Sequence, residues 1–177
     1  LAKMDADAGR KSRMGEAQDR MAARGLRVLA FGEGEFSSED PKEWRIDLCG
    51  LVGFMDPPKE GVREAVLTSK KAGIKVMMIT GDYPLTAKAI AQSVGIWEEG
   101  DRVLLGKEIE ALPARDVYGA LKGATVLARV LPETKYRVVK ALQENGEIVA
   151  VSGDGVNDGP ALKVADLGLA MGSATEA

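Results

Sequence analysis

Short apolar runs alternate with amphipathic stretches along the chain from Leu51 onward. The apolar runs predict strands at 51–54, 74–80, 102–105, 125–130, 147–152 and 167–171. The amphipathic stretches predict helices at 60–73, 84–95, 114–123, 132–146 and 159–165. Apolar strands that alternate with helices of about 10 to 15 residues are typical of a parallel sheet covered on both faces. We therefore predict an α/β fold, a Rossmann-like doubly wound parallel sheet.

The first part of the chain does not follow this pattern. Residues 1–25 predict a charged helix whose apolar residues are mostly Ala and Met, so that it needs a neighbour to pack against. A strand-like run, LRVLAFGE, follows at 26–33, and the polar loop at 37–42 is the candidate boundary with the rest of the chain. We expect this first part to be a separate structural unit.

Polar residues follow four of the predicted strands. They occur in MDPP after 51–54, in TGD after 74–80, in ARVLPETK around the end of 125–130, and in GDGVND after 147–152. Ligands of open α/β sheets bind beyond the carboxyl ends of the strands. We expect all four segments to converge on one edge of the sheet.

Charge and composition limit which partners the chain can bind and which residue types can carry out catalysis at this edge of the sheet. The net charge is -3, from 24 basic and 27 acidic residues, which argues against nucleic acid as a partner. With 45% apolar residues and no run near the roughly 18 that a membrane helix needs, we expect a soluble chain. One cysteine, Cys49, and no histidine exclude an internal disulfide and a histidine-based triad. Asp, Lys, Thr and backbone groups must therefore carry any chemistry.

The tripeptide Thr80-Gly81-Asp82 has two interpretations. A threonine and free amides at a strand end, followed by a helix start, form a common phosphate cradle. A plain turn in which Asp82 caps the next helix explains the same residues.

Lys135 falls in the first turn of a predicted helix, where the helix dipole favours an anion rather than a cation. It could neutralise a phosphoryl oxygen at the sheet edge, or it could be a solvated surface lysine. The sequence pattern alone leaves both possibilities open.

The turn GDGVND brings two carboxylates together after a strand. Crowded carboxylates repel one another unless a hard cation such as Mg²⁺ takes their oxygens as ligands. Asp154 is the candidate direct ligand, and Asn157 and Asp158 are candidates to position water or support the ligand shell. An acidic turn whose glycines supply positive φ is the alternative. No obvious nucleophile accompanies this site, since the prolines after Asp56 suit a hinge better than an attacking group.

These motifs together closely resemble the cytoplasmic part of P-type cation-transporting ATPases, members of the haloacid-dehalogenase-like superfamily. The resemblance rests on MDPPKEGV (55–62), MITGD (78–82), ARVLPETK (128–135) and GDGVNDGPALKVADLGLAMG (153–172), which occur in family order. It implies that ATP phosphorylates an aspartate in an Asp-Lys-Thr-Gly-Thr motif and that hydrolysis of the aspartyl phosphate drives ion movement through membrane helices. That motif is absent from these 177 residues and lies upstream in such pumps.

The resemblance also implies a division of the chain and a role for each motif residue. Residues 1–48 would be the end of a nucleotide-binding domain, and 49–177 the C-terminal part of the phosphorylation domain. Thr80 and Gly81 would hold phosphoryl oxygens, and Lys135 would contact the aspartyl phosphate. Asp154 would bind Mg²⁺ with support from Asn157 and Asp158, and Arg27, Asp82 and Arg129 would approach ATP. Further implied partners are the rest of the pump polypeptide and a cation carried by membrane helices outside this chain, which would place the chain at the cytoplasmic face of a membrane.

Three residues depart from the family pattern: Tyr83 in place of Asn, Ser152 in place of Thr, and Gly159 in place of Ala. None of them removes a charged ligand. Without its upstream motif the chain is expected to be inactive alone and, because a central strand would be missing, to self-associate. The alternatives are a free-standing phosphatase of the same superfamily and a non-catalytic module that binds Mg²⁺ and a nucleotide.

Overall fold

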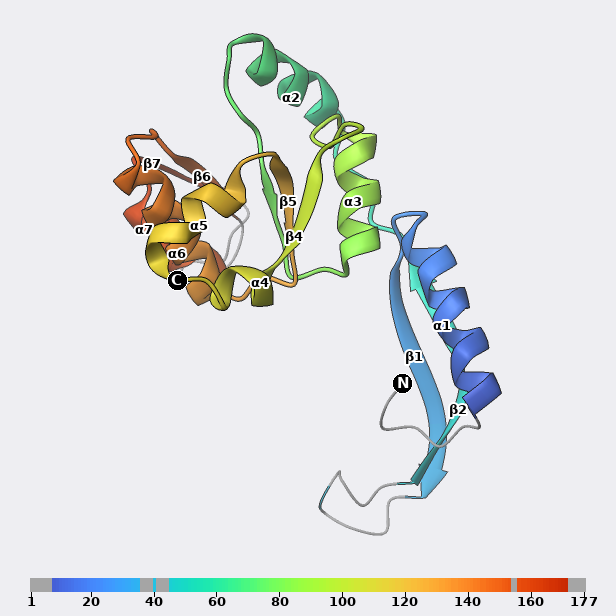
Figure 1. Ribbon diagram of the computed structural model, residues 1–177. Helices are drawn as coiled ribbons and strands as arrows, with labels where there is room; N and C mark the ends of the chain where they lie inside the picture. The colour runs from blue at the N-terminus through green and yellow to red at the C-terminus, as the bar shows by residue number, and fades with distance from the viewer. Residues whose placement is uncertain (1–7, 36–39, 41–44, 154–155, 172–177) are drawn as a thin grey trace.

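The computed structural model describes residues 8–35, 40, 45–153 and 156–171 (Figure 1). Asp154, the candidate Mg²⁺ ligand, and most of the loop at 37–42 lie outside the described residues. Among the described residues, no helix combines the length and the apolar character needed to cross a bilayer.

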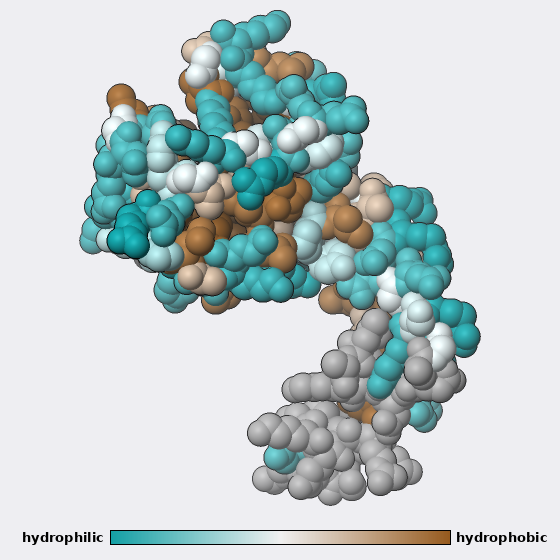
Figure 2. Space-filling model, viewed as in Figure 1, coloured by the Kyte–Doolittle hydropathy of each residue, from teal (hydrophilic) through white to brown (hydrophobic). Residues whose placement is uncertain are grey.

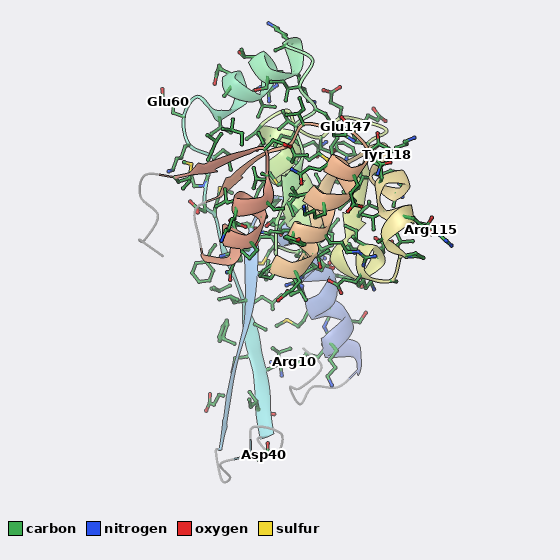
Figure 3. The ribbon with its side chains drawn as sticks, turned by 90° about the vertical axis from the view of Figure 1, so that its left-hand side faces the viewer. Arg10, Asp40, Glu60, Arg115, Tyr118 and Glu147 are labelled. Carbon is green, nitrogen blue, oxygen red and sulfur yellow. The ribbon has the colours of Figure 1, made fainter. Side chains whose placement is uncertain are left out.

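The hairpin unit consists of one helix on a two-stranded antiparallel sheet. Helix α1 (Ala8–Ala22) contacts strands β1 (Arg27–Glu35) and β2 (Arg45–Phe54), which pair along their whole length. Ala22 and Leu48 are buried, at 1% and 0% exposure. The predicted helix in this part of the chain is therefore confirmed for α1, and the hairpin is the neighbour that it needs. In Figures 1 and 3 the hairpin extends away from the rest of the molecule.

Residues 51–54 do not join the parallel sheet, which corrects one expectation. They form the end of β2, where Val52 pairs with Leu29 and Phe54 with Arg27 of β1. Their antiparallel partner, β1, precedes them in the chain, so this run completes the hairpin before the first parallel strand begins. The segment that contains Asp56 therefore follows the hairpin, and only three of the four predicted strand ends belong to parallel strands.

The α/β unit follows, over residues 62–171. Its elements are α2 (Val62–Lys71), β3 (Met78–Ile79), α3 (Pro84–Ser93), β4 (Arg102–Leu105), α4 (Gly106–Glu110), α5 (Ala114–Leu121), β5 (Ala124–Ala128), α6 (Pro132–Glu144), β6 (Ala150–Gly153), a 3₁₀ turn (Val156–Asp158), α7 (Gly159–Val164) and β7 (Leu167–Ala170). Pro84 and Pro132 occupy the first turns of their helices, where the missing N–H leaves no hydrogen bond unmade. Every predicted element of this unit from residue 60 onward is present, and α4 is additional.

Strand β5 is at the centre of the larger sheet, whose order is β3-β5-β4, and it is buried on both faces. Val126 and Ala128 pack with Ala87 and Ala91 of α3, whereas Leu127 packs with residues of α5 and α6. Helices therefore cover both faces, which confirms the doubly wound α/β class. Burial of a Leu or Val side chain contributes roughly 1.5 to 3 kcal/mol, so these two clusters hold the sheet and its helices together. The outward surfaces of the helices are mostly hydrophilic, and hydrophobic residues reach the surface across the middle of the unit (Figure 2).

The parallel strands form two separate sheets rather than one. β6 pairs in parallel with β7, and β3 pairs with β5, but β3 and β6 are not paired with each other. The strand predicted at 74–80 is accordingly short, because its one partner, β5, pairs only with Met78 and Ile79.

A cavity of about 850 Å³, here called the central groove, lies against both strands, with Ile79 and Val151 among its lining residues. Its remaining walls come mainly from apolar residues of α6 and from residues around Ile74 and Ile148.

Candidate active site

Three hydrogen bonds fix the conformation of the Thr80–Asp82 turn, which follows β3. The Thr80 N–H donates to the carbonyl oxygen of Leu127 at 2.9 Å, and its own carbonyl accepts from the Val130 N–H at 3.0 Å. The Asp82 N–H donates to Thr80 Oγ1 at 3.1 Å. Helix α3 takes Tyr83 as its N-cap and has no side-chain cap, so the interpretation of Asp82 as a helix cap is wrong.

Asp82 instead pairs with Arg27 across the boundary between the hairpin and α/β units. Arg27 Nη2 and Nε lie 2.7 Å and 3.2 Å from Asp82 Oδ1. The hydrogen bond and the charge of Asp82 raise the pKa of the Arg27 guanidinium, so the arginine stays charged. Nearby, Thr86 Oγ1 donates to the carbonyl oxygen of Leu26 at 2.9 Å, which ties α3 to the start of β1.

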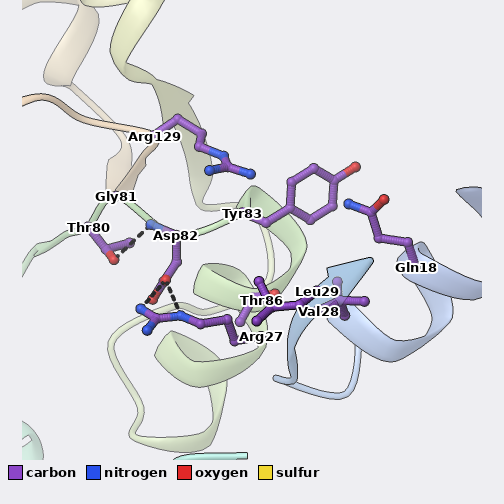
Figure 4. A pocket seen from close by; sticks show the side chains of 11 residues that line it. Gln18, Arg27, Val28, Leu29, Thr80, Gly81, Asp82, Tyr83, Thr86 and Arg129 are labelled. Atoms are coloured by element: carbon purple, nitrogen blue, oxygen red, sulfur yellow. Dashed lines mark hydrogen bonds and ion pairs between the residues drawn. The ribbon is translucent and has the colours of Figure 1, made fainter. Parts of the chain in front are cut away.

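These contacts surround a cavity of about 450 Å³, here called the junction pocket (Figure 4). Its lining residues come from both units: Gln18, Ala22, Arg27, Val28, Leu29, Thr80, Gly81, Asp82, Tyr83, Thr86 and Arg129. All five residues that the sequence assigned to phosphoryl or nucleotide contacts near this edge, namely Arg27, Thr80, Gly81, Asp82 and Arg129, therefore meet in one pocket.

Arg129 enters this pocket from the end of β5. Its guanidinium carbon lies 5.8 Å from the centroid of the Tyr83 ring, toward which Figure 4 shows the side chain directed. Its N–H donates to the carbonyl oxygen of Asp82 at 3.2 Å. Two cationic groups, Arg27 and Arg129, thus line the same cavity, a combination suited to an anionic ligand.

Tyr83 makes a contact that the sequence did not predict. Its hydroxyl donates to Asp19 Oδ1 of α1 at 3.0 Å, and this hydrogen bond raises the pKa of Tyr83. The departure at position 83 was visible in the sequence, but its partner was not, because α1 and α3 meet only in the folded chain.

Lys135 and Asp158 form a second polar group, in the central groove. Lys135 Nζ lies 2.5 Å from Asp158 Oδ1, and their side chains are 17% and 16% exposed. Lys135 is therefore not a solvated surface lysine. Asp158 closes the 3₁₀ turn against β6, where a Cβ at Gly153 would lie only 2.6 Å from the Asp158 Cβ. Asn157 is exposed beside it.

The described residues contain no cluster of three or more Cys, Asp or Glu side chains that could hold a metal ion. Asp154, four residues before Asp158, lies outside the described part of the chain. The donors that this edge can offer are carboxylate and carboxamide oxygens, which is the chemistry that Mg²⁺ prefers. The donor set is therefore compatible with Mg²⁺ near Asp158.

A family model described as haloacid dehalogenase-like hydrolase matches residues 5–166. The chain is 44% identical over 172 residues to a calcium-transporting ATPase of Listeria monocytogenes, which covers 93% of this chain and 19% of that protein. It is 42% identical over 171 residues to calcium-transporting ATPase 1 of Lactococcus lactis, at 94% and 20% coverage. It is also 42% identical over 153 residues to human calcium-transporting ATPase type 2C member 1, at 86% and 16% coverage.

The chain thus spans about a fifth of the length of the curated relatives that it matches. The family match includes the ends of β3 and β5, where Thr80 and Arg129 lie, and the first turn of α6, where Lys135 lies. The chain belongs to the haloacid dehalogenase-like hydrolase family, and most of its length is similar to one part of calcium-transporting ATPases.

Proposed function

We propose that this chain is a catalytic part of an ATP-driven cation pump, which transfers the γ-phosphoryl group of ATP to an aspartate and then hydrolyses the aspartyl phosphate. The observation that carries the proposal is the junction pocket, where two arginines, a threonine hydroxyl and a glycine at a helix start line one cavity. Such groups stabilise phosphoryl oxygens by charge and by hydrogen bonds.

In this proposal Arg27, Asp82 and Arg129 hold the ribose or the phosphates of ATP. Thr80 and Gly81 hold oxygens of the transferring group just before α3, where the helix dipole favours an anion. Lys135 lies within the central groove and neutralises charge on the phosphorylated aspartate. Its ion pair with Asp158 at 2.5 Å supports this role, because the pair orients the ammonium group before the substrate arrives.

The proposed metal ligand is Asp154, with Asn157 and Asp158 supporting it. When bound, Mg²⁺ would neutralise developing charge on the phosphoryl oxygens. Asp154→Ala is expected to abolish Mg²⁺ binding at this edge, measured by calorimetry with Asp40→Ala as the matched acidic control. An unchanged Mg²⁺ affinity would remove Asp154 from this role.

We assign the central groove to the strand that carries the phosphorylated aspartate. The 177 residues contain no Asp-Lys-Thr-Gly-Thr sequence. The groove separates two sets of parallel strands, neither of which has a partner on that side among the described residues, and Lys135 and Asp158 lie within it. A strand inserted there would bring a carboxylate at its end close to these groups.

The proposed division of the chain is the one that the family resemblance implies. Residues 1–48 end a nucleotide-binding domain, and 49–177 form part of the phosphorylation domain; the pairing of β2 as far as Phe54 would keep the whole hairpin with the first. The partners are the rest of the pump and, on the names of the relatives, calcium carried by membrane helices, with this part at the cytoplasmic face.

Titration of the ¹⁵N-labelled chain with a non-hydrolysable Mg²⁺–ATP analogue tests the nucleotide pocket. We expect the largest amide shift changes at Thr80, Gly81, Asp82 and Arg129, and we expect Arg27→Ala to reduce them. Arg115→Ala, which removes an exposed arginine of α5, is the matched control. Shift changes elsewhere, or none at millimolar nucleotide, would contradict the proposal.

Incubation with radiolabelled ATP tests the assignment of the nucleophile to another strand. The 177-residue chain should retain no acid-stable, hydroxylamine-labile label. Label of that kind would instead support a free-standing phosphatase with its own nucleophile in this chain.

A further inference from the structure

Arg129 is the one non-glycine residue with positive φ among the residues that the structure describes, at 54°. This left-handed conformation brings the Cβ of an L-residue close to its own carbonyl oxygen and is disfavoured. Yet Arg129 is also a functional candidate, with its guanidinium in the junction pocket. Strained backbone at a candidate site raises the question of what holds it there.

Two hydrogen bonds hold the Arg129 turn on the side of β3. The Arg129 N–H donates to Asp82 O at 3.2 Å, and the Val130 N–H donates to Thr80 O at 3.0 Å. They bind the turn to the Thr80–Asp82 segment, but they leave the carbonyl of Arg129 free to rotate away.

Gly106 closes the opposite side. It is the buried first residue of α4, and a Cβ at this position would overlap the carbonyl oxygen of Arg129 and lie 3.0 Å from Val130 Cα. The φ of Gly106 itself is not positive, so space rather than conformational freedom requires glycine here. Glu108 Oε2 accepts the Leu105 N–H at 2.6 Å and so fixes the first turn of α4 beside this contact.

We propose that Gly106 is a positioning residue for Arg129. The start of α4 packs directly on the Arg129 carbonyl, and this contact keeps Arg129 in the left-handed conformation that aims its guanidinium into the junction pocket. Gly106 lies in none of the four motifs that carry the family resemblance. The value of this positioning for nucleotide binding rests on the proposed function, whereas the steric coupling does not.

Amide hydrogen exchange tests the steric coupling without any nucleotide. Gly106→Ala should displace the Arg129 carbonyl and speed exchange at the Arg129 and Val130 amides by about tenfold or more. Gly119→Ala is the matched control, because it also replaces a helical glycine and its added Cβ meets nothing within 4 Å. Wild-type exchange rates at both amides in Gly106→Ala would overturn the proposal.

A double-mutant cycle tests whether Gly106 affects the nucleotide through Arg129. By nucleotide titration, Gly106→Ala should weaken binding in the wild-type background and cause no further loss in the Arg129→Ala background. The same fold loss in both backgrounds would indicate a general structural effect and overturn the positioning role. If the wild-type chain does not bind the nucleotide, the proposed function fails, and the exchange experiment still decides the coupling.

The conformation of Arg129 can be tested even if Gly106→Ala does not fold. Arg129→Gly and Arg129→Ala both remove the guanidinium, but only glycine adopts the left-handed region without strain. The Arg129→Gly variant should therefore melt about 2 to 4 °C above Arg129→Ala. Equal melting temperatures would contradict the strain on which the proposal depends.

Discussion

The junction pocket and the central groove are assembled in opposite ways. At the pocket, charged and polar side chains of the hairpin and α/β units pair with each other: Arg27 pairs with Asp82, and Tyr83 of the pocket wall donates to Asp19 of α1. In the groove, the walls are mainly apolar, and the two bordering strands β3 and β6 each have one strand partner within the described part of the chain.

This difference shows what each region needs from outside. Side-chain pairs can complete a polar pocket within one chain, as Arg27 and Asp82 do in the junction pocket. The backbone groups at an open strand edge, however, are best satisfied by another strand. The groove is therefore the region where a further segment of polypeptide is expected to contribute.

The largest change in the free energy of unfolding is expected in the core of the sheet, and a smaller one at the wall of the groove. Leu127→Ala removes a side chain at 0% exposure and should lower the free energy of unfolding by about 2 to 5 kcal/mol. Ile79→Ala removes a partly buried side chain at the groove and should lower it by less, because none of the described strands covers that side of β3. Urea unfolding of both variants measures the difference; equal losses would show that the groove wall is packed like the core.

The Lys135–Asp158 pair should give the next largest effect. Lys135→Met keeps an aliphatic stem but leaves a carboxylate at 16% exposure without its cation, so we expect a loss of about 2 kcal/mol. Lys163→Met, at an exposed position of α7, is the matched control.

Addition of Asp158→Asn to Lys135→Met removes the unpaired charge and should recover part of the stability in urea unfolding. No recovery would mean that the lysine acts mainly by packing rather than by pairing.

The α/β unit was largely predictable because its strands are apolar throughout and its helices are amphipathic, so both patterns follow from burial on two faces of a sheet. Residues 51–54 have the same apolar pattern, yet they pair with β1 in the hairpin. A short apolar run does not state which strand it will join, since pairing depends on contacts between distant residues. The separation of β3 from β6 was predictable only through the family resemblance, which implied a missing central strand.

Residue type at the strand ends predicted the candidate residues; Thr80, Asp82 and Arg129 do line one pocket, whereas Lys135 and Asp158 lie in the central groove. What could not be predicted was their pairing: Asp82 was open to interpretation as a helix cap, but its partner is Arg27, which is 55 positions away in the sequence. Nothing in the sequence indicated a role for Gly106, because the reason for a glycine there is the close approach of the Arg129 and Val130 backbone. Contacts of this kind exist only in the folded chain.

A smaller effect is expected at the pocket from Tyr83→Phe. This change removes the hydroxyl that donates to Asp19 and should lower stability by about 1 kcal/mol or less, since the contact is partly exposed. The raised pKa of Tyr83 means that folding favours the protonated hydroxyl. The contribution is therefore complete below the ordinary tyrosine pKa and is lost as the pH rises through the raised value. Tyr118→Phe, which removes the hydroxyl that donates to Glu147 (Figure 3), controls for the loss of a surface tyrosine hydroxyl.

The smallest change in stability is expected from Asp166→Asn, beside the central groove. It depends on acid pH, whereas the contribution of Tyr83 depends on alkaline pH. Asp166 accepts hydrogen bonds from the Val149 N–H at 2.9 Å and from Gln143 Nε2 at 3.1 Å, and these lower its pKa below the ordinary value. Folding therefore favours the carboxylate, and its contribution is present above the ordinary pKa and is lost as the pH falls through the lowered value. In acid titrations of thermal stability, Asp166→Asn should melt below the wild type near neutral pH, and the difference should shrink as the pH falls below about 4. If the difference in melting temperature stayed constant through this pH range, the Val149 segment beside β6 would be held by packing rather than by the charge of Asp166. The groove wall would then differ from the junction pocket, where ion pairs and hydrogen bonds between side chains join the two units.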